Sequence, residues 1–224
     1  MASQITQNGL AHAARGLATA IACFIVAGTL LRTWIDPMSV SGGSWVTFGV
    51  GIMVLEFVLI HSGAMMASWQ ASKSSSFAKT IIVATCFYGL FAGAMAAAFN
   101  SWDLFLVFSA VMVTRWARIL FDPSHAREEA IRRSGMSVLF YLIAVFVTLF
   151  APIPELGITS SVLNDVYPDR GSGAWERDPE IALAAGVLYF SMLGIAELWS
   201  GFHKERDVLN EDGEAAARAD GGSR

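Results

Sequence analysis

The stretch SWVTFGVGIMVLEFVLIHSGAMMASW, Ser44 to Trp69, decides the fold class of this chain. Its only ionisable side chains are Glu56 and His61, and the rest is predominantly apolar. A helix needs about 20 consecutive apolar residues to cross a hydrocarbon core of about 30 Å. The stretch therefore predicts a transmembrane helix that carries a carboxylic acid and an imidazole inside the bilayer.

The composition of the whole chain agrees with a membrane protein. Of 224 residues, 54% are hydrophobic and 15% are charged, and the mean hydropathy is +0.52. Soluble domains contain about 25% charged residues. Both cysteines, Cys23 and Cys86, lie in apolar runs, so no disulfide framework is indicated.

Six apolar segments are each close to the length of one membrane span. They are 17–34, 44–69, 80–99, 102–121, 136–153 and 181–202. The predicted fold is an all-α, polytopic integral membrane protein with six transmembrane helices. We expect the chain to divide into a cytoplasmic tail (1–16), a membrane domain (17–203) and a polar cytoplasmic tail (204–224). The first segment resembles a signal peptide, but no small-x-small cleavage site follows it, so we expect it to be retained.

The basic residues predict the orientation. With a cytoplasmic N-terminus, Arg32, Arg170 and Arg177 lie outside, and the other twelve lysines and arginines lie inside. We therefore expect both termini in the cytoplasm. The compact form suggests a bacterial inner membrane, with the lipid bilayer as the first partner.

Four connecting segments also carry signals. Asn100–Asp103 predicts a tight external turn between two antiparallel helices. Asp122 to Gly135 predicts a separate short helix that Gly135 ends, and Pro179 predicts the start of the sixth span. The acidic external loop 154–180 is either a cap or docking surface, or a loose loop. The tail after His203 is expected to be disordered beyond its first turns.

Glu56 shares a helical stripe with Gly49 and Gly63, because positions seven apart lie nearly above one another. Glycines let a neighbouring helix backbone approach, so Glu56 is expected to face the protein interior. His61 lies about 140° further around the helix. Two polar faces predict that this span is central in the bundle.

Three more ionisable residues lie in the spans. Arg115 and Arg118 are neighbours on the fourth segment, and Glu197 lies on the sixth with Ser200 nearby. We predict a polar cluster of Glu56, His61, Arg115 and Glu197, supported by Arg118, Gly49, Gly63 and Ser200. Charges inside a bilayer need partners or water, so the cluster is either a binding site or a set of ion pairs that fixes helix register.

Three functions stay open for this cluster. The leading one is a small transporter, permease or channel-like protein for a proton, ion or small polar solute, with Glu56 as the proton or cation site. The second is an accessory or scaffold subunit of a larger membrane complex. Gly89, Gly93 and Ala97 form a small-residue face that predicts close helix packing, within the chain or in a homodimer.

The third function is a redox or metal protein built on His61, with His203 as a haem partner or with both cysteines. His61 is otherwise a proton relay or a neutral ring bonded to a carbonyl. No Walker loop, GxSxG, HExxH or basic nucleic-acid footprint is present. We therefore expect no cofactor, no metal and no nucleic-acid partner, and an enzyme is not favoured.

Overall fold

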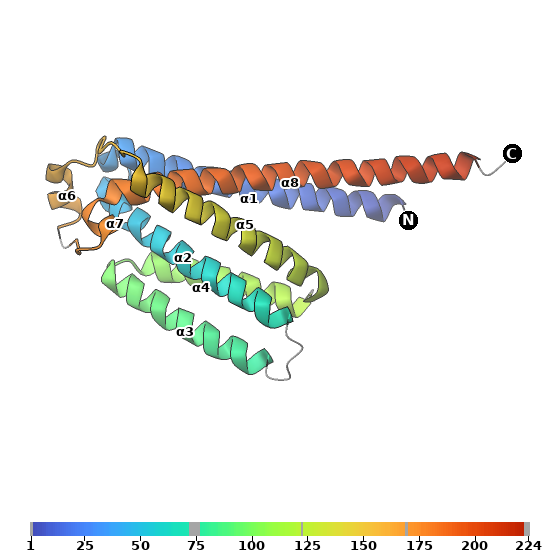
Figure 1. The fold of residues 1–224 in the computed structure, drawn as a ribbon, viewed down its shortest axis with the longest axis horizontal. Helices are drawn as coiled ribbons and strands as arrows, with labels where there is room; N and C mark the ends of the chain where they lie inside the picture. The colour runs from blue at the N-terminus through green and yellow to red at the C-terminus, as the bar shows by residue number, and fades with distance from the viewer. Residues whose placement is uncertain (1, 72–76, 122, 169, 222–224) are drawn as a thin grey trace. The chain divides into compact units, whose positions relative to one another are not determined.

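A computed structural model describes residues 2–71, 77–121, 123–168 and 170–221, and every regular element in them is helical. The chain is therefore all-α over the described ranges (Figure 1). The elements, in chain order, are α1 (Ala2–Ile35), η1 (Pro37–Ser39), η2 (Ser41–Gly43), α2 (Ser44–Ala71), α3 (Phe77–Ala98), α4 (Trp102–Phe121), α5 (Pro123–Phe150), α6 (Ser160–Val166), α7 (Ala174–Arg177) and α8 (Pro179–Gly221).

Three helical stretches in the described residues are long and apolar enough to cross a membrane. They are Gly16–Ile35, Ser41–Gly63 and Pro179–Gly201. Three shorter apolar helical stretches are Ile82–Ala98, Trp102–Thr114 and Ser134–Phe150. The helical fold and three apolar spans are thus compatible with a membrane protein, with fewer long spans than the six predicted.

Two predicted boundaries are wrong. Gly135 does not end a helix, because α5 runs through it to Phe150 and Gly135 keeps a negative φ. Asp122, its predicted N-cap, lies outside the described residues. The C-terminal tail is not irregular, because α8 continues to Gly221. Its EAAARA segment contains strong helix formers, which explains the extension.

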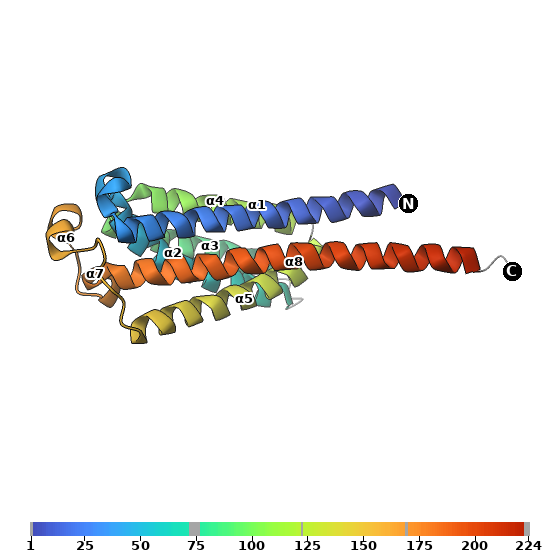
Figure 2. The ribbon, with the colours of Figure 1, turned by 90° about the horizontal axis from the view of Figure 1, so that it is seen from above.

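The helices divide into two compact units. One is formed by the chain up to Gly28 and from Phe190 onwards, and the other extends from Thr29 to Tyr189. In the first unit, α1 and α8 lie side by side and antiparallel (Figure 2). A Cβ on Gly16 would be 3.2 Å from the Glu197 carbonyl oxygen, and one on Gly194 would be 2.9 Å from the Phe24 ring. Gly16 thus permits a close backbone approach.

In the second unit α2 is central, because it contacts α3, α4 and α5 (Figure 1). The predicted tight turn between α3 and α4 is confirmed: the Ser101 N–H donates to the Ala96 carbonyl, and Asn100 has a φ of 47°. Leu104, in the first turn of α4, is the nearest neighbour of Gly51, near the start of α2. The turn therefore lies at the end of the unit where α2 begins.

The first turns of α8 run parallel to α2. The nearest neighbour of Gly49 is Leu183, and Gly186 lies beside Met53. Residue numbers rise in the same direction along both helices, from Gly49 to Met53 in α2 and from Leu183 to Gly186 in α8, so the two helices are parallel. Pro179 begins α8, as predicted from the sequence.

The loop before α8 is an ordered cap rather than a loose loop. The Gly157 N–H donates to the Trp34 carbonyl at 3.0 Å, and the Trp34 indole N–H donates to the Pro154 carbonyl at 2.9 Å. Ile158 and Leu163 are buried, and the Thr159 hydroxyl accepts from the Val162 N–H at the start of α6. These bonds fix the cap to the end of α1.

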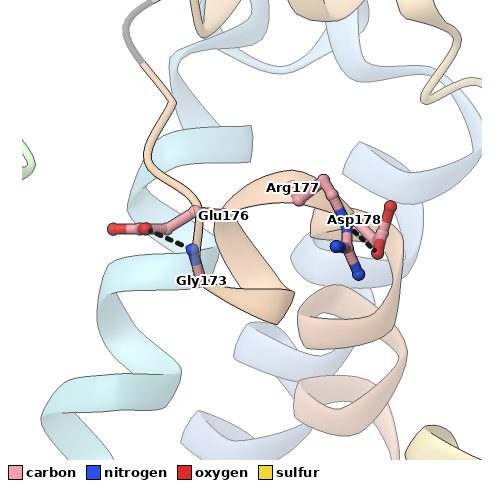
Figure 3. Close-up of polar contacts among 4 residues, drawn as sticks. All are labelled: Gly173, Glu176, Arg177 and Asp178. Carbon is pink, nitrogen blue, oxygen red and sulfur yellow. Dashed lines mark hydrogen bonds and ion pairs between the residues drawn. The ribbon is translucent and has the colours of Figure 1, made fainter.

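The last part of this loop forms α7. The Glu176 carboxylate accepts from the Gly173 N–H at 3.1 Å, and Arg177 pairs with Asp178 at 3.0 Å (Figure 3). The Arg177–Asp178 pair is largely exposed, so it contributes at most about 1 kcal/mol to stability. The Glu176 contact satisfies an N-terminal donor that the short helix leaves open.

Candidate functional site

Glu56 lies about two-thirds of the way along the apolar stretch Ser41–Gly63 and is half-buried. The residues around it contain no proline, so the helix continues on both sides of the acid. The Tyr189 hydroxyl, from the first turns of α8, donates to Glu56 Oε2 at 3.1 Å. The parallel packing of α2 and α8 makes this contact possible, because Tyr189 follows Gly186 by nearly one turn.

A second tyrosine lies beside this pair. The Tyr141 hydroxyl of α5 donates to the Met53 carbonyl at 2.9 Å, one turn before Glu56. The Tyr141 and Tyr189 rings meet edge to face, with centroids 5.7 Å apart and an interplanar angle of 83°. Both tyrosines and Met53 are buried. We call Glu56, Tyr141 and Tyr189 the Glu56 cluster.

The glycine stripe of α2 has a different role from the one predicted. A Cβ on Gly49 would be 2.5 Å from Leu183 Cδ2 and 3.0 Å from Leu30 Cδ2. The nearest atoms are therefore leucine side chains rather than a helix backbone. Gly63 is also buried, as expected for this face. The stripe holds Glu56 on the inner side of α2 by making room for these leucines.

His61 lies on another face of α2, as predicted, and its side chain is exposed. Its Nδ1 is 3.3 Å from the Phe57 carbonyl oxygen, and its ring is 4.3 Å from the Phe57 ring. Of the roles considered for His61, this geometry matches the ring bonded to a carbonyl. A role as a proton relay stays a prediction.

The cluster of four residues stays a prediction, because its members do not all lie in one described unit. Glu56 and His61 belong to one compact unit and Glu197 to the other. The side chains of Arg115 and Arg118 lie outside the described residues. Among the described residues, the buried polar side chains are those of Thr33, Ser62 and Thr148, and none of these is charged.

Glu197 and Ser200 are linked within α8. The Ser200 hydroxyl donates to the Glu197 carbonyl oxygen at 3.1 Å, and the Glu197 side chain is half-buried. This bond is a common local contact of serine in a helix. The proposed balance between Glu197 and the arginines stays a prediction.

Metal ligation finds no support in the described ranges. No group of three or more histidine, cysteine, aspartate or glutamate side chains there has an arrangement that fits a metal ion. Cys23 is half-buried in one unit and Cys86 is exposed in the other. The side chain of His203 lies outside the described residues.

Tyr141 and Tyr189 are the site residues that sequence reasoning missed. Both are phenols inside apolar helices, and a buried tyrosine hydroxyl usually finds a polar partner. A search for hydroxyls in the spans, in addition to charges, identifies both. Only the packing of α8 beside α2 connects Tyr189 to Glu56.

No protein-family model matches this chain, and neither the curated proteins nor the solved structures contain a significant match. The Glu56 cluster itself is therefore the basis for assigning a function.

Proposed function

We propose that this chain is a six-span membrane transporter or channel-like protein in which Glu56 binds and releases a proton or a small cation. Both termini lie in the cytoplasm of a bacterial cell in this proposal, and the protein resides in the inner membrane. In the proposal Arg115 provides the counter-charge, His61 tunes protonation, and Glu197 balances the arginines near the cytoplasmic mouth.

The direction of the helices supports six spans. If α2 and α8 both cross the membrane in the same direction, the chain between them must cross an odd number of times. Three apolar helices, α3, α4 and α5, lie between them. The end of α5 also leads to Pro154, whose carbonyl accepts a hydrogen bond from the Trp34 indole at the end of α1. The ends of α1 and α5 therefore lie on the same side in this arrangement.

The surfaces of these three helices support the same conclusion. Leu90 on α3 is 77% exposed and Phe150 on α5 is 81% exposed, and further large apolar side chains are exposed along both helices and on α4. Soluble monomers rarely expose contiguous apolar patches of more than a few hundred Å². Lipid is a suitable environment for such faces.

One observation carries the functional proposal: a half-buried carboxyl inside an apolar span accepts a hydrogen bond from a tyrosine of another helix. An ionised side chain at the bilayer centre costs about 2.5–3.5 kcal/mol or more, so such residues generally serve ion or proton pathways. Partial exposure of Glu56 leaves it open to exchange with a ligand.

Flux through liposomes tests the proposal. The full chain, purified in mild detergent, is reconstituted with an internal pH-sensitive dye and subjected to proton, sodium or potassium gradients. We expect Glu56→Gln to abolish the flux and His61→Ala to reduce it. Glu155→Gln, which changes an exposed carboxyl of the cap, is the matched control and should retain the flux. Equal flux through wild type and Glu56→Gln would overturn the proposal.

Cysteine labelling tests the topology. In a variant with both native cysteines replaced by serine, Ser101→Cys places a thiol at the turn between α3 and α4. A membrane-impermeant maleimide should label it from outside the cell only if both helices cross the bilayer. Ser172→Cys, in the external loop, is the positive control. Labelling of Ser101→Cys only after cell lysis contradicts six spans.

The second candidate function is a subunit of a larger membrane complex, and the exposed face of α3 favours it. A Cβ on Gly89 would have no neighbour within 4 Å, and Ala97 is exposed. Helix α3 instead presents the fully buried Ala92 and Ala96 to the interior. Of the three small residues, Gly93 faces the Phe105 ring of α4, 3.9 Å from a Cβ built on it, whereas Gly89 and Ala97 leave an open surface for a partner. Mass spectrometry of the complex purified from native membranes should reveal a stoichiometric partner if this candidate is correct.

A further inference from the structure

We infer that the species bound at Glu56 is a proton, and that Tyr189 and Tyr141 are the positioning residues of this proton site. The inference rests on the proposed function, because it names the ligand of the same carboxyl. It adds two residues that the charge pattern of the sequence does not indicate.

The printed contact at Glu56 fits a proton. A proton needs one carboxylate oxygen and one hydrogen-bonding neighbour, and the Tyr189 hydroxyl is such a neighbour at 3.1 Å from Oε2. The Tyr141 hydroxyl donates to the Met53 carbonyl, so its role is to position the site.

Tyr189 suits both charge states of that carboxyl. A phenol is both a donor and an acceptor. When Glu56 is ionised, the Tyr189 O–H donates to Oε2 across the observed 3.1 Å. When a proton binds to Oε1, Oε2 becomes the carbonyl oxygen of the neutral carboxyl and still accepts from the Tyr189 O–H. The contact therefore persists through a cycle of proton uptake and release, and the buried Tyr189 hydroxyl keeps its acceptor.

Tyr141 holds Tyr189 in place. Its hydroxyl is fixed to the backbone of α2, and its ring packs edge to face against the Tyr189 ring. Rotation of the buried Tyr189 side chain away from Glu56 would lose this aromatic contact, which is worth about 0.5–1.5 kcal/mol. Two helices, α5 and α8, thus position one hydroxyl on one carboxyl.

The titratable groups around Glu56 come from several helices. Tyr141 of α5 and Tyr189 of α8 face it, and His61 lies on the other face of α2. Tyr88 of α3 donates to the Met65 sulfur, more than two turns away along α2. The arginine side chains of α4 lie outside the described residues. Tyr189 donates directly to the Glu56 carboxylate, so its removal should change proton binding.

Carbodiimide labelling of the full chain in liposomes tests this inference. Dicyclohexylcarbodiimide enters apolar regions and modifies protonated carboxyls, and peptide mass spectrometry measures modification at Glu56. At fixed ionic strength, we expect labelling to depend on pH and to be the same in sodium, potassium or N-methylglucamine. Tyr189→Phe should move the midpoint of labelling to higher pH by about one unit, a tenfold change, because the ionised carboxylate loses a charge-assisted bond.

Tyr88→Phe is the matched control, because it removes a phenol that contacts Met65. It should leave the midpoint unchanged. An identical midpoint in wild type and Tyr189→Phe would overturn the positioning role. Protection of Glu56 by sodium or potassium at constant pH would overturn the proton assignment, while a Glu56-dependent flux in the same liposomes would leave the proposed function standing. Flux that is independent of Glu56 would instead refute the proposed function.

Discussion

Replacement of Gly186 by alanine tests the packing that brings Tyr189 to Glu56. The new methyl group would be 2.5 Å from Leu30 Cδ1 and 3.2 Å from the Met53 sulfur. Carbon atoms in van der Waals contact are about 3.5–4.0 Å apart. The methyl group therefore needs about 1 Å of displacement, against two side chains that are fully buried.

The magnitude follows from two opposing effects. Overpacking of a well-packed core typically costs about 1–3 kcal/mol. Alanine in a helix interior is favoured over glycine by about 1 kcal/mol, which offsets part of that cost. The expected net loss of unfolding free energy in Gly186→Ala is therefore about 0–2 kcal/mol.

Gly89→Ala on α3 is the matched control, because a Cβ there meets nothing within 4 Å. It receives the same helix-propensity gain without the clash, so it should be stabilised by up to about 1 kcal/mol. The difference in unfolding free energy between the two variants measures the packing cost alone, and we expect it to be about 1–3 kcal/mol.

Reversible unfolding in mixed micelles, with increasing dodecyl sulfate and circular dichroism as the signal, measures both variants against wild type. Equal free energies of unfolding for Gly186→Ala and Gly89→Ala would refute the packing of α8 against α2 and α1 described above. Flux of Gly186→Ala in liposomes should also fall, because a displaced α8 moves Tyr189 away from Glu56.

Three further predictions concern other contacts. Tyr141→Phe removes the bond to the Met53 carbonyl and should lower the free energy of unfolding by about 0.5–1.5 kcal/mol in the same micelle titration. Gly157→Ala would drive a methyl group into the Ile35 carbonyl oxygen, so amide hydrogen exchange in the cap should accelerate while exchange in α3 is unchanged. Burial, and then the nearby Glu176 carboxylate, raise the pKa of Tyr167 from 10.0 to about 12. Because the neutral phenol is favoured in the folded cap, this stabilisation is complete below pH 10 and is lost as the pH rises towards 12, and a 295 nm absorbance titration of wild type against Tyr167→Phe measures it.

The central position of α2 was predictable because it depends on one local sequence pattern. Apolar residues surround Glu56 and His61 on all sides of the helix, and such a helix is expected inside a bundle. The turn at Asn100 and the helix start at Pro179 were predictable for the same reason, since each depends on a few adjacent residues.

The partners of Glu56 were not predictable, because they depend on contacts between distant parts of the chain. Tyr189 reaches Glu56 only because Gly186 lets Leu30 and Met53 approach α8. The sequence shows a glycine and a tyrosine three residues apart, which is compatible with many packing arrangements. Charge alone directed attention to Arg115, whose side chain lies outside the described residues.

The end of the helix predicted at Gly135 was wrong for a different reason. Glycine in a helix interior costs about 1 kcal/mol relative to alanine, which is too little to stop a helix that continues into an apolar segment. Gly42 and Gly43, which lie between α1 and α2, do interrupt the regular helix and have positive φ values of 63° and 90°. Composition alone does not distinguish these two situations.

Two substitutions at Glu56 distinguish a carboxyl that only holds α2 and α8 together from a carboxyl that binds a proton. Glutamine keeps an oxygen that accepts from Tyr189, so Glu56→Gln should leave the packing of α2 and α8 nearly unchanged whichever role is correct. Leucine gives the buried Tyr189 hydroxyl no acceptor at that position, which costs about 1–3 kcal/mol. If Glu56 only ties the helices, Glu56→Gln retains wild-type behaviour and Glu56→Leu alone is impaired. If Glu56 carries a proton, Glu56→Gln is inactive, because an amide does not exchange a proton in this pH range. If Arg115 is its counter-charge, Glu56→Gln also loses stability, because it leaves that arginine unpaired. Wild-type flux in Glu56→Gln would contradict the functional carboxyl.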